Sequence, residues 1–151
     1  MTKKKVIAYC TISLLLGILI GGFLFSKSQR RSVFAIPECS NCWNPNEVLG
    51  LLASIGIQKT PHLVPNVVYE TDKTIVVRHP FPTSPYHVLI LPKRDIKNIG
   101  DMGPDDLAYL TDALTVAAHL IKENNLKSYQ LWTNGPGNQI AAYLHWHLGG
   151  A

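Results

Sequence analysis

The sequence predicts an α+β protein with an antiparallel sheet of about five strands, one short helix and one long helix, all preceded by a transmembrane helix. Three observations lead to this prediction. Residues 6–25 carry no charge, five short segments downstream have the composition of strands bounded by turns, and one amphipathic helical pattern lies between the third and the fourth of these segments. Strands joined by short turns, with one long helical connection, are typical of an antiparallel α+β domain. Residues 1–25 are therefore assigned to a membrane anchor, 26–38 to a tether and 39–151 to the folded domain.

The uncharged N-terminal segment is predicted to be an uncleaved single-pass anchor. Its 20 residues would form a helix roughly 30 Å long, which matches the hydrocarbon thickness of a bilayer. The run is longer than the apolar part of a typical signal peptide, and no convincing cleavage site follows it directly. Basic residues flank both ends, at positions 3–5 and at Lys27, Arg30 and Arg31. The N-terminal amine and the tight lysine cluster favour an N-inside orientation, with the domain on the non-cytoplasmic side.

The positive charge of the chain comes from the residues that flank this anchor. The full sequence has a formal net charge of +4, whereas residues 32–151 contain eight basic against ten acidic residues, a net charge of −2. A nearly neutral domain has no basic patch for nucleic acid, so nucleic acid is not an expected partner. Cys10 lies inside the anchor, and the two remaining cysteines, Cys39 and Cys42, are too few for a disulfide framework.

The elements of the domain follow in order from their local patterns. A short helix is predicted over 46–56 with Asn46 as its N-cap, and two prolines mark the loop after it. The loop HPFPTSP (79–85) is too rich in proline for a regular element, and NGPGNQ (134–139) forms a tight loop. The expected strands are a hairpin of 67–70 and 74–78, then 87–92, 129–133 and a final strand at the C-terminal end.

The long helix is predicted over 104–125. Pro104 suits the first turn of a helix, and the two aspartates that follow complement the positive end of the helix dipole. Apolar residues that recur at spacings of three and four predict the buried stripe, which consists of Leu107, Leu110, Leu114, Ala117 and Ile121. His119 falls on the opposite, polar side, where an ordinary surface histidine is expected.

The C-terminal stretch AAYLHWHLGGA (141–151) alternates with the period of a half-buried strand. Two faces are predicted, one with Tyr143, His145 and His147 and a buried one with Leu144, Trp146 and Leu148. Histidines two positions apart on a strand lie roughly 6–7 Å from each other, so one substrate or one metal ion can contact both. A pair of solvated histidines on an edge strand is the alternative.

His87 begins a predicted strand, so His87, His145 and His147 form a cluster if the two strands meet. Neutral imidazole is a competent nucleophile toward phosphorus near pH 7, and partial burial disfavours its charged form. The glycines at 135 and 137 can bring backbone N–H groups close to a phosphate, although a simple turn is the alternative. These residues therefore suggest phosphoryl chemistry or metal binding.

Two segments, VVYETDKTIVVRHPFPTSPYHVLILPKRDI (67–96) and YQLWTNGPGNQIAAYLHWHLGG (129–150), resemble the histidine-triad (HIT) family, and most of all its Hint branch of nucleoside phosphoramidate hydrolases. The resemblance implies an α+β sheet that commonly dimerises into a continuous ten-stranded sheet. It implies that His145 attacks the α-phosphorus to form a nucleotidyl-histidine intermediate, that His147 contacts phosphate oxygens and that His87 supports them. The implied substrate-binding residues are Asn134 and Gln139 of the phosphate loop, Leu89 as an apolar wall of the nucleoside pocket, and Tyr143.

Three positions depart from the family pattern. Tyr143 stands where the family has its first triad histidine, and His79 stands where a ribose-binding aspartate is usual. Ile140 replaces a hydroxyl residue that helps the leaving group. These departures imply that activity is weak, shifted to another substrate, or lost.

Cys39-x-x-Cys42 also resembles the pair with which many bacterial family members bind structural zinc, together with the upstream histidine and the first triad histidine. Here that set would be Cys39, Cys42, His87 and position 143, where Tyr143 is a poor zinc ligand. His79 or His62 is a candidate substitute. If the domain lies outside the cytoplasm, a disulfide between the two cysteines is the competing outcome.

Three functional hypotheses follow. The leading one is a membrane-anchored HIT-type nucleotidyl hydrolase or transferase that cleaves purine nucleotide phosphoramidates or esters, requires no cofactor, and for which the resemblance implies a homodimer. The second is a non-catalytic nucleotide-binding domain. The third is a zinc-binding domain in which His145, His147 and the cysteines hold the metal.

Overall fold

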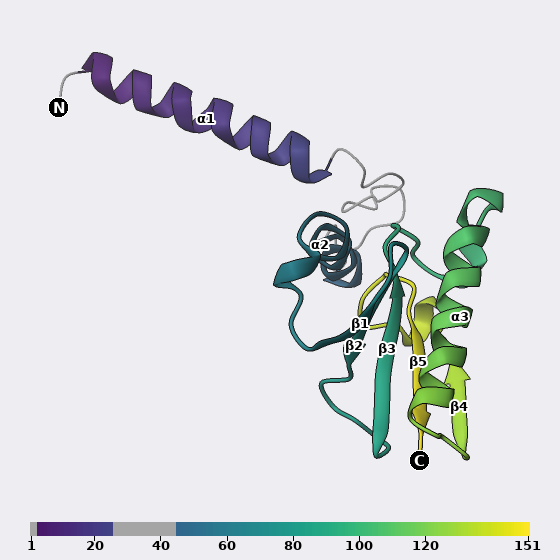
Figure 1. Cartoon of the computed structure of the whole chain (residues 1–151). Coiled ribbons are helices and arrows are strands. Elements are labelled where there is room, and N and C mark those ends of the chain that lie inside the picture. Colours follow the sequence, from purple (N-terminus) through teal and green to yellow (C-terminus); the bar gives the residue numbers. More distant parts are fainter. Residues whose placement is uncertain (1–2, 26–44) are drawn as a thin grey trace.

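The computed structural model describes residues 3–25 and 45–151. One five-stranded antiparallel sheet forms the centre of the domain, with its strands in the order β1-β2-β3-β5-β4 (Figure 1). The strands are β1 (Val67–Glu70), β2 (Thr74–Arg78), β3 (Tyr86–Pro92), β4 (Tyr129–Trp132) and β5 (Trp146–Gly150), and the helices are α1 (Lys3–Phe25), α2 (Pro45–Lys59) and α3 (Leu107–Glu123). The predicted α+β class, with five antiparallel strands, is confirmed. The expected tether and both domain cysteines lie outside the described residues.

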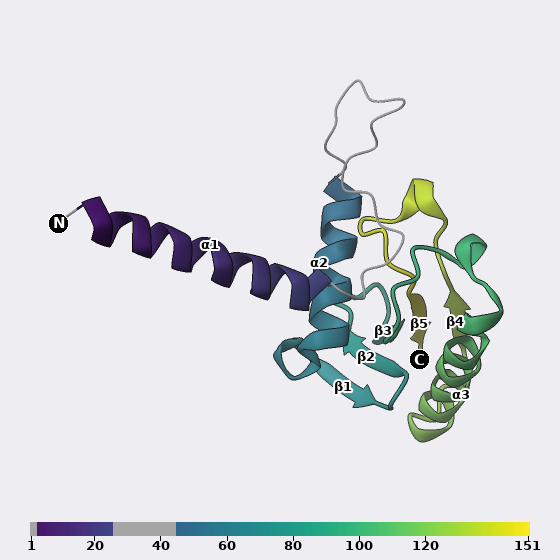
Figure 2. The same cartoon turned by 90° about the horizontal axis from the view of Figure 1, so that it is seen from above.

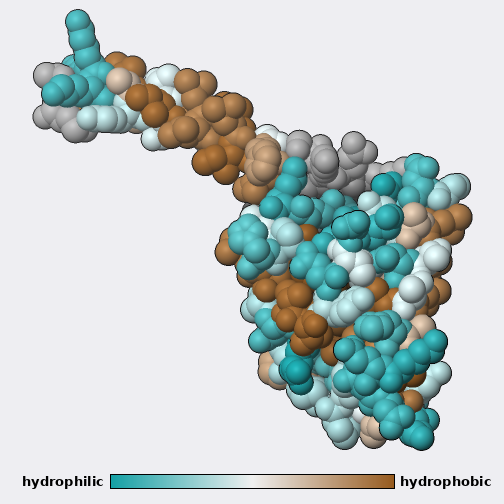
Figure 3. Space-filling view, viewed as in Figure 1, coloured by the Kyte–Doolittle hydropathy of each residue, from teal (hydrophilic) through white to brown (hydrophobic). Residues whose placement is uncertain are grey.

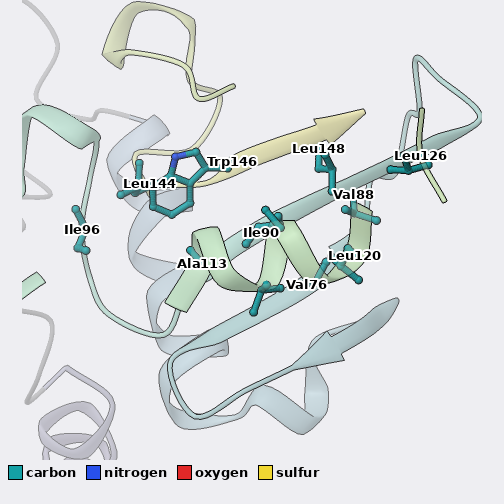
Figure 4. Close-up of a cluster of buried hydrophobic side chains, with 12 residues drawn as sticks. Val76, Val88, Ile90, Ile96, Ala113, Leu120, Leu126, Leu144, Trp146 and Leu148 are labelled. Atoms are coloured by element: carbon teal, nitrogen blue, oxygen red, sulfur yellow. The ribbon is translucent and has the colours of Figure 1, made fainter. Parts of the chain in front are cut away.

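The main core lies between the sheet and α3. Side chains alternate along a strand, so Val88 and Ile90 of β3 and Leu148 of β5 face α3 (Figure 4). From α3 they meet Ala113, Val116, Ala117 and Leu120. The predicted burial of Leu144, Trp146 and Leu148 is confirmed, with exposed fractions of 0%, 5% and 0%.

A second, smaller core lies on the opposite face of the sheet, under α2. Ile57 of α2 packs there with Ile75 of β2 and Tyr143, and Figure 2 shows α2 and α3 on different sides of the strands. Asn46, expected to cap the helix, lies in its first turn and donates a hydrogen bond from its side chain to the carbonyl of Gln139. The start of α2 is thereby tied to the loop that precedes β5.

The buried stripe of α3 differs from the predicted one. Leu107 and Leu114 are 56% and 45% exposed, whereas Ala113, Val116 and Leu120 are buried. The α-helix begins only at Leu107, after a separate 3₁₀ turn at Pro104–Asp106. The smaller side chains of the buried face let the helix approach the sheet closely. His119 is exposed, as predicted, and its Nε2 lies 3.5 Å from the carboxylate of Glu123.

The last strand also begins later than its alternation predicts. β5 starts at Trp146, and Tyr143 lies before it in a bend with its ring in the second core. The reason is in the backbone: the N–H of Ala142 donates to Asn46 and that of Leu144 donates to Ile96, so this segment does not pair with β3. The prediction that Tyr143, His145 and His147 share one strand face is therefore wrong.

α1 is the one helix of the described chain that is long and apolar enough to cross a membrane. None of its apolar window is buried, and it projects away from the domain with an apolar surface along most of its length (Figure 3). Near its C-terminal end, the Phe23 ring lies 4.5 Å from Nζ of Lys59, at the end of α2. Its length and composition thus fit a membrane span next to the domain.

Candidate active site

Four histidines from two distant segments of the sequence, 79–87 and 145–147, come together on β3 and on the ends of its neighbours β2 and β5. In the register of the sheet, Leu89 of β3 lies opposite His147 of β5, which makes His87 and His147 diagonal neighbours on the face opposite α3. His79 follows β2 directly, and its backbone N–H donates to the carbonyl of His87 over 3.0 Å. His145 precedes β5. The ring centroids are 4.1 Å apart for His79 and His87, 5.4 Å for His87 and His147, 5.5 Å for His79 and His147, and 5.0 Å for His145 and His147.

Trp132 covers one side of this histidine cluster. It is the residue of β4 that lies opposite His147, and its ring stacks on the His147 imidazole at 4.9 Å with an interplanar angle of 7°. It also lies 5.6 Å from the His87 ring. The indole thus fixes the plane of His147 and shields it from water.

Hydrogen bonds determine the proton positions on His87 and His147. Nδ1 of His87 lies 3.1 Å from the backbone nitrogen of Thr83, whose N–H can only donate, so the proton of the neutral His87 ring is on Nε2. Nε2 of His87 lies 3.2 Å from Nδ1 of His147 and donates to it. Since Nδ1 of His147 accepts, the proton of that ring is on Nε2. His147 therefore offers its Nε2–H as a donor, whereas its Nδ1 faces His87.

The proton of His145 is on the other ring nitrogen. Its Nδ1 lies 2.7 Å from the carbonyl oxygen of Tyr143, which can only accept. Nδ1 of His145 must then carry the proton, and Nε2 has a free lone pair. The hydroxyl of Thr133 donates to the His145 carbonyl at 2.7 Å, which holds the backbone of this residue to the end of β4. The cluster consequently pairs one nucleophilic nitrogen with neighbouring donors.

Burial keeps these rings neutral. Burial, and after it the neighbouring histidines, lower the pKa of His147 to about 4. Burial also lowers the pKa of His145, although the hydrogen bond to the Tyr143 carbonyl counteracts this effect. The pKa of His87 is lowered by burial and then by His79. Near pH 7 the lone pair on His145 is therefore available.

The loop after β4 supplies polar groups beside the cluster. Nδ2 of Asn134 lies 3.5 Å from Nε2 of His147, and a 180° rotation of that amide would present its oxygen to the ring proton. Gln139 is buried, and its Nε2 has no hydrogen-bond partner within residues 45–151. A buried unpaired amide is costly unless a ligand satisfies it. Ile140 next to it is 80% exposed.

The remaining expected site residues lie in different places. Leu89 is half-buried on the same strand face as His87. Tyr143 is 1% exposed, and its hydroxyl donates to the backbone carbonyl of Pro92 in a short hydrogen bond. The Tyr143 side chain is thus a core residue, and only its backbone carbonyl belongs to the site.

Two residues of the site were not singled out for this role from the sequence. His79 was considered only as a departure from the family pattern and as a substitute zinc ligand, and Trp132 was considered only as part of a strand. Their positions in the sequence could have identified them, because each lies at the end of a strand, beside a loop that precedes or contains expected site residues.

Within the described chain, the hydrogen bonds of the clustered histidines do not fit a resident metal ion. One ring nitrogen from each of His79, His87 and His147 lies within 4.8 Å of the others, a spacing that admits a cation. Metal-bound histidines, however, usually donate a hydrogen bond from the second nitrogen, and here Nδ1 of His79 and Nδ1 of His87 both accept from backbone N–H groups. The zinc set that the resemblance implies includes position 143, where the Tyr143 hydroxyl is engaged elsewhere.

Comparison with known proteins defines the family. A family model described as "Scavenger mRNA decapping enzyme C-term binding" matches residues 56–150. An uncharacterized HIT-like protein of Synechococcus elongatus is 35% identical over 86 residues, which cover 55% of this chain and 75% of that protein. One of Chlamydia muridarum is 33% identical over 84 residues, which cover 54% of this chain and 67% of that protein. The chain belongs to the histidine-triad (HIT) family.

Solved HIT structures agree with this assignment. The crystal structure of a HIT family hydrolase from Legionella pneumophila is 31% identical and superposes with a TM-score of 0.58, over 63% of this chain and 89% of that one. A HIT family hydrolase from Clostridium thermocellum gives a TM-score of 0.59 at 27% identity, over 64% and 89% of the two chains. Both segments that carry the sequence resemblance lie within residues 56–150, which the family model matches.

Proposed function

We propose that this chain is a membrane-anchored HIT-type nucleotidyl hydrolase or transferase that cleaves purine nucleotide phosphoramidates or esters through a nucleotidyl-His145 intermediate. The observation that carries the proposal is the 2.7 Å contact between Nδ1 of His145 and the Tyr143 carbonyl, which leaves Nε2 as an uncharged nucleophile. The purine base and the phosphoramidate bond come from the resemblance to the Hint branch.

The chemistry has two steps. Nε2 of His145 attacks phosphorus, a P–N bond forms, and the bond from phosphorus to the leaving nitrogen or oxygen breaks. Water then attacks the same phosphorus, the bond to Nε2 breaks, and the nucleotide leaves with the neutral ring restored. In a transferase reaction, another acceptor takes the place of this water. The leaving group takes up one proton and the attacking water releases one, so the protons balance.

The neighbouring groups stabilise the charges that develop in these steps. The ring of His145 becomes cationic while phosphorus is attached, and the carbonyl oxygen of Tyr143 faces its Nδ1–H. Nε2–H of His147 is placed to donate to a phosphate oxygen, where a preorganised donor lowers the barrier. His87 is a positioning residue, because its hydrogen bond fixes which nitrogen of His147 carries the proton.

The leaving group receives little help from the protein. Ile140 stands where the family pattern has a hydroxyl residue that helps the leaving group, and its side chain has no hydroxyl. The proton for the departing amine or alcohol then comes from solvent. Substrates with good leaving groups are therefore favoured. A non-catalytic nucleotide-binding role is the competing hypothesis, and Ile140 and His79 are the departures from the family pattern that favour it.

The proposal also includes a membrane anchor and a homodimer. α1 anchors the protein, and the charges at its ends favour the domain on the non-cytoplasmic side. The sheet ends at β4 within the described chain, and Tyr129 on that strand is 50% exposed. Pairing of two β4 strands would extend the sheet to ten strands, the homodimer that the family resemblance implies.

Turnover of an adenylyl-lysine phosphoramidate by the full chain in detergent micelles tests the activity. Wild-type protein is expected to release AMP, and His145→Ala is expected to lose this activity. His119→Ala, at an exposed position of α3, is the matched control and retains it. Nucleotide binding without any turnover by the wild type would overturn the enzymatic proposal and support the binding domain.

A further inference from the structure

His79 is held in the histidine cluster by two backbone contacts. Its N–H donates to the His87 carbonyl, and its Nδ1 accepts from the backbone N–H of Phe81 over 3.0 Å. Its ring lies parallel to that of His87, at a centroid distance of 4.1 Å and an interplanar angle of 11°. The loop between them contains Pro80, Pro82 and Pro85, which restrict its backbone. The position and the plane of the His79 ring are therefore set before any ligand arrives.

The same contacts determine what the His79 ring can offer to a ligand. Because Nδ1 accepts from Phe81, the proton of the neutral ring is on Nε2. Its ring contacts are with the imidazoles of His87 and His147, on which the Trp132 indole packs in turn. None of the hydrogen bonds found in residues 45–151 engages Nε2 of His79. His79 thus carries a donor without an acceptor, next to the proposed phosphate donor on His147.

Donors and acceptors recognise different ligand groups. A carboxylate accepts hydrogen bonds from the two hydroxyls of an unmodified ribose, whereas an N–H donor, and still more a protonated imidazole, pairs with phosphate oxygens. The cluster holds imidazole donors at His79 and His147 with their ring centroids 5.5 Å apart. Two phosphate groups of one ligand can be that close.

We propose that His79 determines substrate specificity by binding a second phosphate of the substrate, beside the phosphate that reacts at His145. The substrate class is then a nucleotide with two phosphate groups. The second group is attached either to the reacting phosphate as an anhydride or to the ribose. This inference rests on the proposed function, since it places the reacting phosphate at His145 and His147.

Calorimetric titration of the full chain in detergent micelles tests this inference without depending on turnover. The probes are AMP, the α,β-methylene analogue of ADP, which cannot be cleaved, and adenosine 3′,5′-bisphosphate. The variants are His79→Asp, His79→Gln and the exposed control His119→Gln. Wild type and the control are expected to bind the ADP analogue or the bisphosphate about tenfold more tightly than AMP, since charge-assisted hydrogen bonds to phosphate are the strong ones. The probe that gains this affinity identifies where the second phosphate is attached.

The variants separate the possible outcomes. In His79→Asp, the preference is expected to disappear while AMP still binds, because a carboxylate repels the second phosphate. His79→Gln keeps an amide donor without the ring and is expected to retain part of the preference. Equal affinities in the wild type, or a preference that survives His79→Asp, would overturn this inference alone. If no nucleotide binds to the wild type, the proposed function is overturned as well.

Discussion

Nε2 of His87 and Nδ1 of His147 lie 3.2 Å apart, across the pairing of β3 with β5. This contact links a backbone N–H in the proline-rich loop to the outer nitrogen of His147, because each ring accepts at one nitrogen and donates at the other. The sheet register therefore determines the protonation pattern of the site.

Removal of the His87 ring is expected to slow turnover. In His87→Ala, Nδ1 of His147 loses its donor, and the ring can place its proton on either nitrogen. Loss of a buried hydrogen bond costs about 1–3 kcal/mol, which corresponds to a kcat lower by roughly fivefold to 150-fold. Steady-state kinetics at saturating substrate measure this change. A kcat equal to that of the wild type would show that His87 does not position His147.

Turnover is expected to fall in acid and to stay level near neutrality. The pKa of His145 is lowered by burial, so its lone pair remains free as the pH falls below the ordinary histidine value of 6.5 and is lost only at lower pH. A profile of kcat/KM against pH, with a substrate that does not titrate in this range, checks this expectation. An activity that rises with acidification would contradict a neutral nucleophile.

Protein stability is expected to fall over a defined acidic range. The pKa of His147 is lowered from 6.5 to about 4 in the folded state, so between these values the unfolded chain binds a proton that the folded chain does not. The free energy of unfolding therefore decreases as the pH falls from about 6.5 to about 4. Urea unfolding across this range measures the decrease, and His147→Gln should make it smaller. An unchanged slope in that variant would show that another group causes it.

A hydroxyl at position 140 is expected to raise the turnover of substrates that have poor leaving groups. Ile140 is 80% exposed, so Ile140→Ser should leave the fold unaffected. If the serine hydroxyl reaches the departing amine, turnover of alkyl phosphoramidates should rise about a hundredfold, the lower edge of the gain typical of acid–base assistance. Substrates with acidic leaving groups should gain little. Equal gains for both substrate classes would argue against leaving-group assistance.

Tyr143 is expected to matter for stability rather than for catalysis. Tyr143→Phe removes the buried hydrogen bond to the Pro92 carbonyl and should lower the free energy of unfolding by about 1 kcal/mol or somewhat more. Turnover should remain close to that of the wild type, because His145 is held by the backbone carbonyl of residue 143. Denaturant titration and kinetics on the same preparation distinguish the two roles. A large loss of turnover at unchanged stability would show instead that the Tyr143 hydroxyl takes part in catalysis.

Local sequence patterns predicted most of the sheet, because turns and the alternation of buried side chains depend on residues that are close in the sequence. The β1–β2 hairpin was predicted at its observed bounds, and Thr71 shows why: its hydroxyl accepts from the N–H groups of residues 73 and 74 and closes the turn. The buried face of β5 was likewise evident from its alternation. The late start of β5 was not, since it depends on hydrogen bonds from Ala142 and Leu144 to distant segments.

The positions of site residues on strands were predictable from the sequence, whereas the positions of those on loops were less so. His87 and His147 meet because two correctly predicted strands pair. The turning of Tyr143 into the core and the stacking of His79 on His87 depend on tertiary contacts that alternation does not encode. For α3, spacing predicted one stripe that includes Leu107 and Leu114, whereas packing against the sheet buries the neighbouring face with Ala113 and Val116. The proposed cysteine ligands fall outside the described residues.

The central claim is that a phosphorus–nitrogen bond forms on His145. The full chain, mixed with nucleotide phosphoramidate labelled in the adenine and quenched in alkali within the first turnover, should retain the label on the peptide that contains residue 145. Mass spectrometry should place it on the His145 ring, and the label should be absent from His145→Ala. A label on another residue, or turnover by the wild type without any trapped adduct at any quench time, would contradict the account.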